Sequence, residues 1–165
     1  MGNTEEALNT WRRVEKQSIS HTVLVAQRLM DGYQAVGRPQ EGISLLKSYL
    51  AEAASIDLLE VVFQAVLKED GIEAANTLVH DELRRTPTLL GLDKLLEAQL
   101  LVVPPEIRQD LSFVRNLVQR YASKLSRYKC DHCGFEARQF YWQCPGCHQW
   151  ETYPPRRTEE LKISA

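Results

Sequence analysis

The sequence has 165 residues, of which 44% are hydrophobic and 25% charged, and its formal net charge is −2 at pH 7. This composition is typical of a globular protein, and the length suits one domain of ordinary size together with a small module. The near-zero charge gives no global electrostatic footprint for nucleic acid or an anionic membrane. No apolar run approaches the ~20 residues that cross a bilayer, and the polar residues 1–6 exclude a signal peptide, so we predict a soluble chain.

Residues 4–126 carry helical periodicity interrupted by short breakers, with no strand signal. The spacing of apolar residues predicts about seven helices, the first of them capped by Thr4 and broken at residues 18–22. Gly37 is expected to end the second helix, and Pro39 is expected to open the third. The later breakers are Ser55 and Thr86-Pro87, which we predict to cap the fourth and sixth helices, together with Asp70-Gly71 and Pro104-Pro105.

An internal repeat relates two parts of this helical region. Tyr33-Gln34-Ala35-Val36 recurs as Phe63-Gln64-Ala65-Val66, and Gly42-Ile43 recurs as Gly71-Ile72, at offsets of 30 and 29 residues. Helix pairs that repeat at roughly this period form an α-solenoid of the tetratricopeptide kind, and an irregular helical bundle is the alternative. Because the first predicted helix is the second half of a pair, we expect the natural protein to have more repeats upstream.

The four cysteines of the chain lie together and form two Cys-x-x-Cys pairs separated by ten residues. Two thiolates three residues apart in a tight turn face one ion, and two such turns close a tetrahedral four-sulfur shell. Gly134 and Pro145-Gly146 tolerate the backbone geometry that such turns need. We therefore predict a structural metal site whose ligands are Cys130, Cys133, Cys144 and Cys147.

The same stretch has alternative interpretations. Two disulfides would need an oxidising compartment, and a thioredoxin-like redox pair would need a strand–helix unit around it. His132 and His148 are further candidate ligands, but four thiolates already complete the shell. The aromatic residues around the cysteines are interpreted as the core of a small module that the metal stabilises, with a base-stacking surface as the alternative.

Catalytic motifs are absent from the sequence. It has no Gly-rich phosphate loop, no nucleophile elbow and no His-Glu-x-x-His motif, and its cysteines are assigned to metal, so we predict that the chain is not an enzyme. We predict instead a scaffold that binds partners on the concave face of its helices. The polar residues expected in the partner groove are Arg28, Asp31, Gln64 and Lys68. Arg156 and Arg157 are expected to lie in a solvated tail.

Tetratricopeptide-like helices that lead directly into a C-terminal rubredoxin-type module resemble the lipopolysaccharide assembly protein B family. The resemblance covers essentially the whole chain and rests on Arg-Leu-Met-Asp at 28–31, Ser-Ile-Asp-Leu-Leu at 55–59 and the segment 127–150. Its most specific part is Tyr-Trp-x-Cys-Pro-x-Cys at 141–147. We accordingly divide the chain into a tetratricopeptide-like helical-repeat domain (1–126), a rubredoxin-type metal-binding module (127–155) and a flexible tail (156–165).

The resemblance implies an adaptor on the cytoplasmic side of the bacterial inner membrane that regulates lipopolysaccharide biosynthesis. Members of the family promote degradation of the deacetylase that commits sugar nucleotide to lipid A, and a membrane-bound AAA+ metalloprotease performs that degradation. Lipopolysaccharide assembly and export proteins are further expected partners. The family's N-terminal membrane helix and early repeats have no counterpart in this sequence, so membrane attachment is expected only through an upstream segment.

The resemblance also carries the family's metal ligands onto the same four cysteines. Tetrahedral thiolate suits both zinc and iron, and we favour zinc as the structural ion. Two other functions remain open as alternatives to the adaptor: electron transfer by an iron–thiolate centre, and nucleic-acid binding by a zinc ribbon. The sparse basic residues of the module disfavour the second of these.

Overall fold

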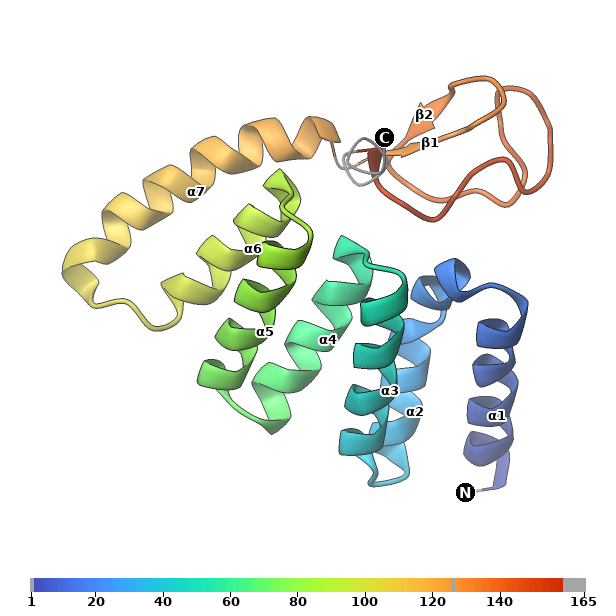
Figure 1. Cartoon of the computed structure of the whole chain (residues 1–165), viewed down its shortest axis with the longest axis horizontal. Coiled ribbons are helices and arrows are strands. Elements are labelled where there is room, and N and C mark those ends of the chain that lie inside the picture. The colour runs from blue at the N-terminus through green and yellow to red at the C-terminus, as the bar shows by residue number, and fades with distance from the viewer. Residues whose placement is uncertain (1, 126, 159–165) are drawn as a thin grey trace. The chain divides into compact units, whose positions relative to one another are not determined.

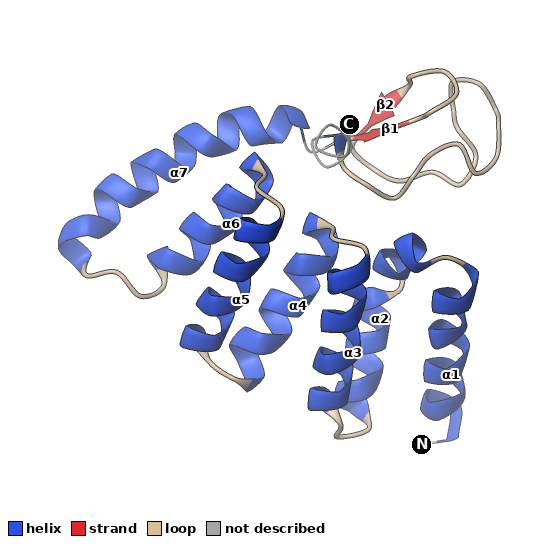
Figure 2. Cartoon of the chain, in the orientation of Figure 1, coloured by secondary structure: helices blue, strands red, loops and turns tan. Residues whose placement is uncertain are grey.

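The computed structural model describes residues 2–125 and 127–158. The chain divides into two compact units, Met1–Asp81 and Glu82–Ala165, and the division falls within one helix. Helices dominate, and the described residues contain one two-stranded sheet, which belongs to a segment composed largely of loops (Figure 2). The predicted fold class is confirmed, because stacked helices precede a small four-cysteine module.

The first unit consists of helices that pack on their sequence neighbours (Figure 1). Contacts also join α2 to α4, and such next-but-one contacts are typical of stacked helical pairs. None of the helices in the described residues has the length and hydrophobicity of a bilayer-crossing segment. The elements are α1 (Gly2–Gln17), the 3-10 helix η1 (Ile19–Leu24), α2 (Ala26–Ala35), α3 (Pro39–Glu52), α4 (Ile56–Glu69) and most of α5 (Ile72–Arg85).

Apolar side chains at helical spacing form the core of this unit. Leu29, Leu46 and Val62 are completely buried, and Phe63 is 1% exposed. Glycine allows the closest helix crossings. A Cβ atom on Gly32 would lie 2.8 Å from Leu8 Cδ2 of α1, so a larger residue there would separate α1 from α2.

Several predicted boundaries are confirmed and others are wrong. Gly37 adopts a φ of 74° just after α2, and Pro39 is the first residue of α3, as predicted. Thr4 lies inside α1 and does not cap it. The predicted break at residues 18–22 is largely helical, because residues 19–24 form the 3-10 helix η1.

The two predicted caps of later helices also differ from expectation. Ser55 has the extended backbone of an N-cap residue, but its side chain makes no capping hydrogen bond and its buried hydroxyl has no partner. The cap of α6 is Thr88, whose Oγ1 accepts a hydrogen bond from Gly91 N at 2.8 Å. Thr86 is still bonded to the last turn of α5, since its N–H donates to Glu82 O. The sixth helix therefore begins two residues later than Pro87 would place it.

The internal repeat is correct in its first half and wrong in its second. Tyr33 and Phe63 are both buried, and each is the eighth residue of its helix, α2 or α4. Gly42, however, lies inside α3, whereas Gly71 precedes α5 with a φ of 89°. The start of α5 lies 33 residues after the start of α3, so the buried Ala75 is the counterpart of Gly42. Both positions carry small residues, and a Cβ atom on Gly42 would lie 2.9 Å from Tyr33 Cβ of α2.

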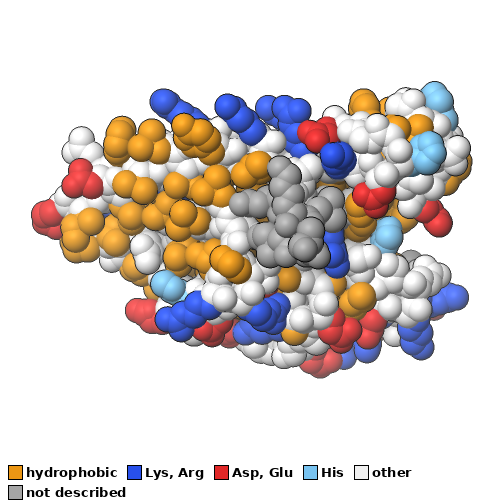
Figure 3. Space-filling model, turned by 45° about the horizontal axis from the view of Figure 1, so that its top comes forward, with side chains coloured by type: hydrophobic (Ala, Val, Ile, Leu, Met, Phe, Trp, Pro, Cys, Tyr) orange, Lys and Arg blue, Asp and Glu red, His pale blue; other side chains and the backbone are white. Residues whose placement is uncertain are grey.

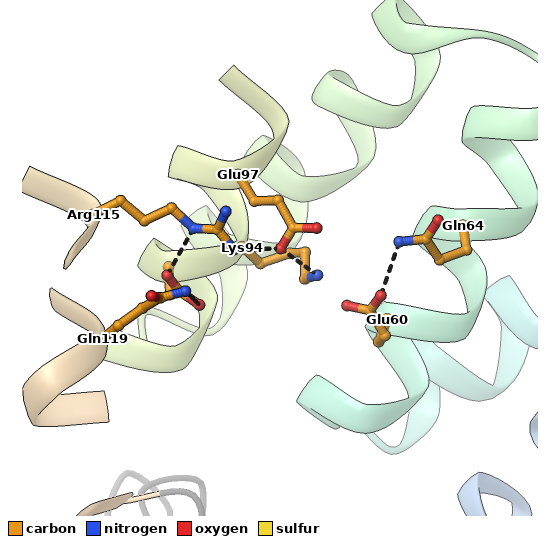
Figure 4. A network of polar contacts seen from close by, with 7 residues as sticks. Glu60, Gln64, Lys94, Glu97, Arg115 and Gln119 are labelled. Atoms are coloured by element: carbon orange, nitrogen blue, oxygen red, sulfur yellow. Dashed lines mark hydrogen bonds and ion pairs between the residues drawn. The ribbon is translucent and has the colours of Figure 1, made fainter. Parts of the chain in front are cut away.

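The second unit contains the hairpin of α6 (Leu89–Leu100) and α7 (Pro105–Leu125). Arg115 of α7 joins the two helices, because its Nε donates to Asp93 Oδ1 at 3.1 Å and its Nη2 donates to Glu97 Oε2 at 2.7 Å. Lys94 is 8% exposed and donates to the same Glu97 carboxylate at 2.9 Å (Figure 4). The fork of Arg115 thus fixes which side of α7 faces α6.

Candidate metal centre

The first Cys-x-x-Cys turn follows the strand β1 (Tyr128–Lys129) and precedes β2 (Glu136–Ala137). The strands are antiparallel, with Lys129 opposite Glu136. Within the turn, Cys130 N donates to Phe135 O and Gly134 N donates to Cys130 O, each at 2.9 Å. Gly134 has a φ of 76°, which allows the chain to turn back after the second cysteine. We call residues 130–135 the first knuckle.

Residues 144–149 form a second knuckle with the same hydrogen bonds, fourteen residues further along the chain. Cys144 N donates to Gln149 O and His148 N donates to Cys144 O, again at 2.9 Å. An isolated β-bridge between Gln143 and Trp150 joins the two ends of the second knuckle, as the pairing of β1 with β2 joins the two ends of the first knuckle. The two turns are therefore local copies of one structure, although their sequences share little beyond the cysteines.

The four sulfur atoms form one compact cluster. All lie within 4.8 Å of one another. The shortest separations join the two knuckles: Cys133 Sγ lies 3.6 Å from Cys144 Sγ, and Cys130 Sγ lies 3.8 Å from Cys147 Sγ. These distances exclude disulfides, whose sulfurs are about 2.05 Å apart. Four sulfurs at about 2.3 Å from a central ion are about 3.8 Å apart in a tetrahedron, so the cluster fits one tetrathiolate metal ion.

The protonation of the cluster is uneven. Burial raises the pKa of Cys130, but a hydrogen bond between its sulfur and the Thr152 hydroxyl at 3.2 Å and hydrogen bonds from the N–H groups of Cys133 and His132 lower that pKa to about 6. A hydrogen bond from Phe135 N–H lowers the pKa of Cys133, but burial and the three neighbouring thiols raise it to about 12. The thiolate of Cys130 therefore forms readily while Cys133 stays protonated. Negative charges at this spacing repel each other, and a bound cation would relieve the repulsion.

Aromatic rings complete the core around the cluster. Tyr153 is 2% exposed, and its hydroxyl donates to Tyr128 O at 3.1 Å. Its ring contacts those of Tyr128, Phe140 and Tyr141, with centroids 5.9 to 6.3 Å apart. Burial raises the pKa of Tyr153 to about 12, so it stays neutral near pH 7. The predicted small aromatic core is thus present, and the buried Cys130 and Cys144 belong to it.

Other aromatic residues of the module point outward. Trp142 is 53% exposed and Trp150 is 65% exposed. His132 and His148 are exposed as well and lie outside the sulfur cluster. The predicted ligand set therefore remains the four cysteines that the fold gathers.

Sequence reasoning missed three features of the knuckles. His148 has a φ of 60° and occupies the left-handed position that Gly134 holds in the first knuckle. The sequence predicts Gly146 for its backbone freedom, but this glycine has no positive φ. Its role is spatial, because a Cβ atom there would lie 3.1 Å from Phe135 Cβ and 3.3 Å from Cys133 Sγ, so this glycine lets the knuckles approach each other. The third is the thiol partner Thr152. Alignment of the two knuckles at a spacing of fourteen would have identified the first feature, since position 148 then falls on Gly134.

The expectation that Arg156 and Arg157 lie in a solvated tail is wrong, because both are half-buried and Arg157 contacts the module. The Arg157 guanidinium lies over the Tyr128 ring at 4.2 Å, and its Nη1 donates to Arg138 O at 3.1 Å. Thr158 N donates to Arg127 O, and its hydroxyl donates to Leu125 O at the end of α7. Residues 159–165 of the predicted tail lie outside the described part of the chain. The proposed division into domains at residues 126 and 155 therefore remains a prediction.

Two of the four polar residues predicted for a partner groove line a pocket between α2 and α4. Its volume is about 410 Å³. Gln64 and Lys68 lie along it, whereas Arg28 and Asp31 are exposed on α2 and do not line it. Glu60 Oε1 accepts a hydrogen bond from Gln64 Nε2 at 2.9 Å, which orients the Gln64 amide (Figure 4). The residues lining the pocket are Gln27, Met30, Gln34, Val61, Gln64, Ala65, Leu67 and Lys68.

Comparison with known proteins agrees with the geometry. A family described as a rubredoxin metal binding domain matches residues 128–155. Lipopolysaccharide assembly protein B of Escherichia coli strain K12 is 28% identical over 157 residues, which cover 94% of this chain and 40% of that protein. The protein of the same name from Haemophilus influenzae is 23% identical over 164 residues, which cover 96% of this chain and 40% of that protein.

The resemblance inferred from the sequence is therefore confirmed. The chain is similar to lipopolysaccharide assembly protein B along 94% of its length, and residues 128–155 match the rubredoxin metal binding domain. It spans about 40% of the length of these curated relatives.

Proposed function

We propose that this protein is an adaptor that regulates lipopolysaccharide biosynthesis by holding partner proteins on its helices, with the four-cysteine module as a structural metal site. The observation that supports this most is the 28% identity to lipopolysaccharide assembly protein B, which extends through both the helices and the module. A match confined to the module would support only a shared metal site. The match over the whole chain supports a shared combination of helices and module.

The partners proposed from the family are a membrane-bound AAA+ metalloprotease and the deacetylase at the committed step of lipid A synthesis. In this proposal the adaptor brings the deacetylase to the protease and so lowers deacetylase abundance. Lipopolysaccharide assembly and export proteins are additional partners. The proposed site of action is the cytoplasmic side of the inner membrane, with attachment through an upstream segment. The role is one of binding and not of catalysis.

The pocket between α2 and α4 is the proposed docking site for one of these partners. Its floor includes the apolar Met30 and Ala65, while its rim carries the amides of Gln27 and Gln64 and the ammonium group of Lys68. Amide side chains both donate and accept hydrogen bonds, so they suit an extended peptide backbone, and Lys68 suits an acidic side chain. Apolar floors with a few polar groups at the rim are typical of specific binding sites.

Cys130, Cys133, Cys144 and Cys147 would hold the ion. The ion would supply cross-links between the two knuckles, and we propose zinc, with iron as the alternative. Electron transfer is favoured by one observation, the exposure of Cys133 at the surface of the module. Metal analysis of the purified chain separates the two functions, because zinc has no accessible redox change.

A quantitative pull-down from bacterial envelope extract tests the adaptor function. The chain is immobilised as bait, and the retained proteins are identified by mass spectrometry. We expect enrichment of the protease, the deacetylase or lipopolysaccharide-export proteins. Lys68→Glu, which reverses the charge in the α2–α4 pocket, is expected to reduce retention of at least one of these about tenfold, because a close like-charge contact costs more than about 1 kcal/mol.

Lys47→Glu is the matched control, since Lys47 is an exposed lysine of α3 that does not line the pocket. It should leave retention unchanged. Retention of the proposed partners that is equally insensitive to both substitutions would refute the pocket as the docking site but keep the adaptor function. Retention of reductases or flavoproteins alone, with iron in the chain, would instead favour electron transfer.

A further inference from the structure

Helix α7 has a row of regularly spaced residues on a face that does not pack on α6. Six of its residues recur at alternating spacings of four and three, which places them along one seam of the helix. In chain order this seam contains two acidic, two apolar and two basic residues. They are Glu106, Asp110, Phe113, Leu117, Arg120 and Lys124.

The seam is open to solvent. Phe113 is 63% exposed and Leu117 is 40% exposed, and the four charged residues are exposed as well. Val114 and Tyr121, which adjoin the seam, are 45% and 65% exposed. Figure 3 shows hydrophobic side chains gathered over this part of the molecule, with Lys and Arg side chains along one edge. Large apolar side chains that remain together at the surface usually mark an interaction site.

The face of α7 that packs on α6 is a different one. Ala122 is its buried residue, and Arg115 is held by Asp93 and Glu97 of α6. Residues 115 and 122 are one heptad apart and lie about 160° to 180° around the helix from the middle of the seam, at 100° per residue. Burial against α6 therefore leaves the seam accessible.

The order of acidic, apolar and basic residues along the seam makes it complementary to an antiparallel copy of itself. Phe113 and Leu117 lie two residues on either side of position 115. Asp110 and Arg120 lie five residues on either side of it, and Glu106 and Lys124 lie nine residues on either side. A second α7 placed antiparallel about this centre therefore brings an acidic group opposite a basic one at every charged position. A parallel arrangement would place like charges together.

We propose that α7 is a self-association surface on which two copies of this chain pack their α7 helices antiparallel. Phe113 and Leu117 of both copies form the apolar centre. Asp110 of one copy pairs with Arg120 of the other, and Glu106 pairs with Lys124. Twofold symmetry makes each ion pair twice, so four pairs flank one apolar centre.

Two features favour this occupant. The helix is already formed in the fold, so association does not have to order it, which removes a large cost of pairing short helices. The heptad spacing is that of helices crossing at about 20°, which keeps a seam in contact over several turns.

An anionic lipid surface is the main competitor, because residues 111–130 contain five basic residues and no acidic one. Glu106 and Asp110 disfavour it, since they occupy the same seam and would face the lipid.

Charge exchange between two variants of the full chain tests the proposal. One variant carries Glu106→Lys with Asp110→Lys, and the other carries Arg120→Glu with Lys124→Glu. Mass is measured by sedimentation velocity across a concentration series. We expect the unsubstituted chain to form a dimer, each variant alone to weaken it about tenfold or more, and an equimolar mixture of the two to recover it. Recovery in the mixture also shows that neither variant is unfolded.

The matched control is Arg108→Glu, which reverses the charge of an exposed α7 residue that lies about 160° around the helix from the middle of the seam and should leave the dimer intact. Phe113→Glu should dissociate the dimer. A chain that is monomeric at every concentration refutes the proposal, and so does a dimer that resists all of these substitutions. A monomer that co-sediments with phosphatidylglycerol vesicles, and loses this with Arg120→Glu, would assign the seam to lipid instead.

Discussion

The helical unit of residues 2–81 and the metal module of residues 128–158 are stabilised by different means. The helical unit buries aliphatic and aromatic side chains such as Leu29, Val62 and Phe63, and needs nothing else to fill its core. The buried core of the module comprises Tyr128, Cys130, Cys144 and Tyr153, so half of its members are predicted metal ligands. A segment this short cannot bury enough apolar surface to fold by packing alone, and its core chemistry therefore has to include a cross-link.

Removal of metal should show this difference most strongly. Structural zinc sites contribute about 10–16 kcal/mol of apparent binding free energy at pH 7, and much of that free energy is folding free energy. We expect Cys144→Ser, or a strong chelator, to unfold the module while most of the helical circular dichroism at 222 nm remains. The fluorescence of Trp142 and Trp150 reports on the module. We also expect weaker partner binding, through the loss of structure.

His132→Ala is the control for this prediction, since His132 is an exposed residue between two of the predicted ligands. It should retain the full metal content. A Cys144→Ser chain that remains folded and metal-loaded would contradict a structural tetrathiolate site. Loss of metal in His132→Ala would indicate that His132 is a metal ligand.

Truncation of a core ring should have the converse effect. Phe63→Ala removes a side chain that is 1% exposed in α4 and is expected to lower the free energy of unfolding of the helical unit by about 3–5 kcal/mol. The metal content of the module should not change. Denaturant titration followed by circular dichroism measures the first effect, and Gln64→Ala on the exposed side of the same helix should change stability by less than about 0.5 kcal/mol. Equal effects of the two substitutions would show that the α4 core is misplaced.

The two helix caps offer a finer comparison within the helices. Thr88→Ala removes a side chain that accepts from Gly91 N at 2.8 Å, and should cost about 1 kcal/mol. Ser55→Ala removes a hydroxyl that is buried without a partner, so it should be neutral or slightly stabilising. Thermal unfolding of the two variants side by side checks the order. If Ser55→Ala lowers the stability more than Thr88→Ala does, the Ser55 hydroxyl does cap α4.

The smallest expected effect distinguishes the two knuckles of the module. His148→Gly relieves a left-handed conformation that glycine adopts without strain, and the net gain is about 0.5–1 kcal/mol after the added entropy of the unfolded chain is included. Gly134→Ala, at the equivalent position, should lose about 1 kcal/mol or more. Resistance of the metal-loaded module to chelator and heat measures both. If His148→Gly weakens the module, the imidazole contributes a contact worth more than the strain.

Much of this protein was determined by its sequence alone. Apolar residues at helical spacing located the helices, because burial of one face is what makes a helix stable in water. Gly37 and Pro39 marked a boundary correctly, since positive φ and a missing N–H are local properties of the residues concerned. The two Cys-x-x-Cys pairs defined the candidate metal site, because thiolates at that spacing have few other uses. The motif around Tyr141 and Cys147 carried the family resemblance.

Other features depend on tertiary structure. Whether Ser55 or Thr88 caps its helix is decided by where each hydroxyl points after packing. The correspondence of Gly42 with Ala75 follows from one additional turn in α4, which no local pattern shows. The need for a glycine at position 146 arises only when the two knuckles meet, because a Cβ atom there would lie 3.1 Å from Phe135 Cβ and 3.3 Å from Cys133 Sγ. Propensity is a property of a residue, but a cap, a helix crossing or a ligand shell is a relation between residues that only the folded chain brings together.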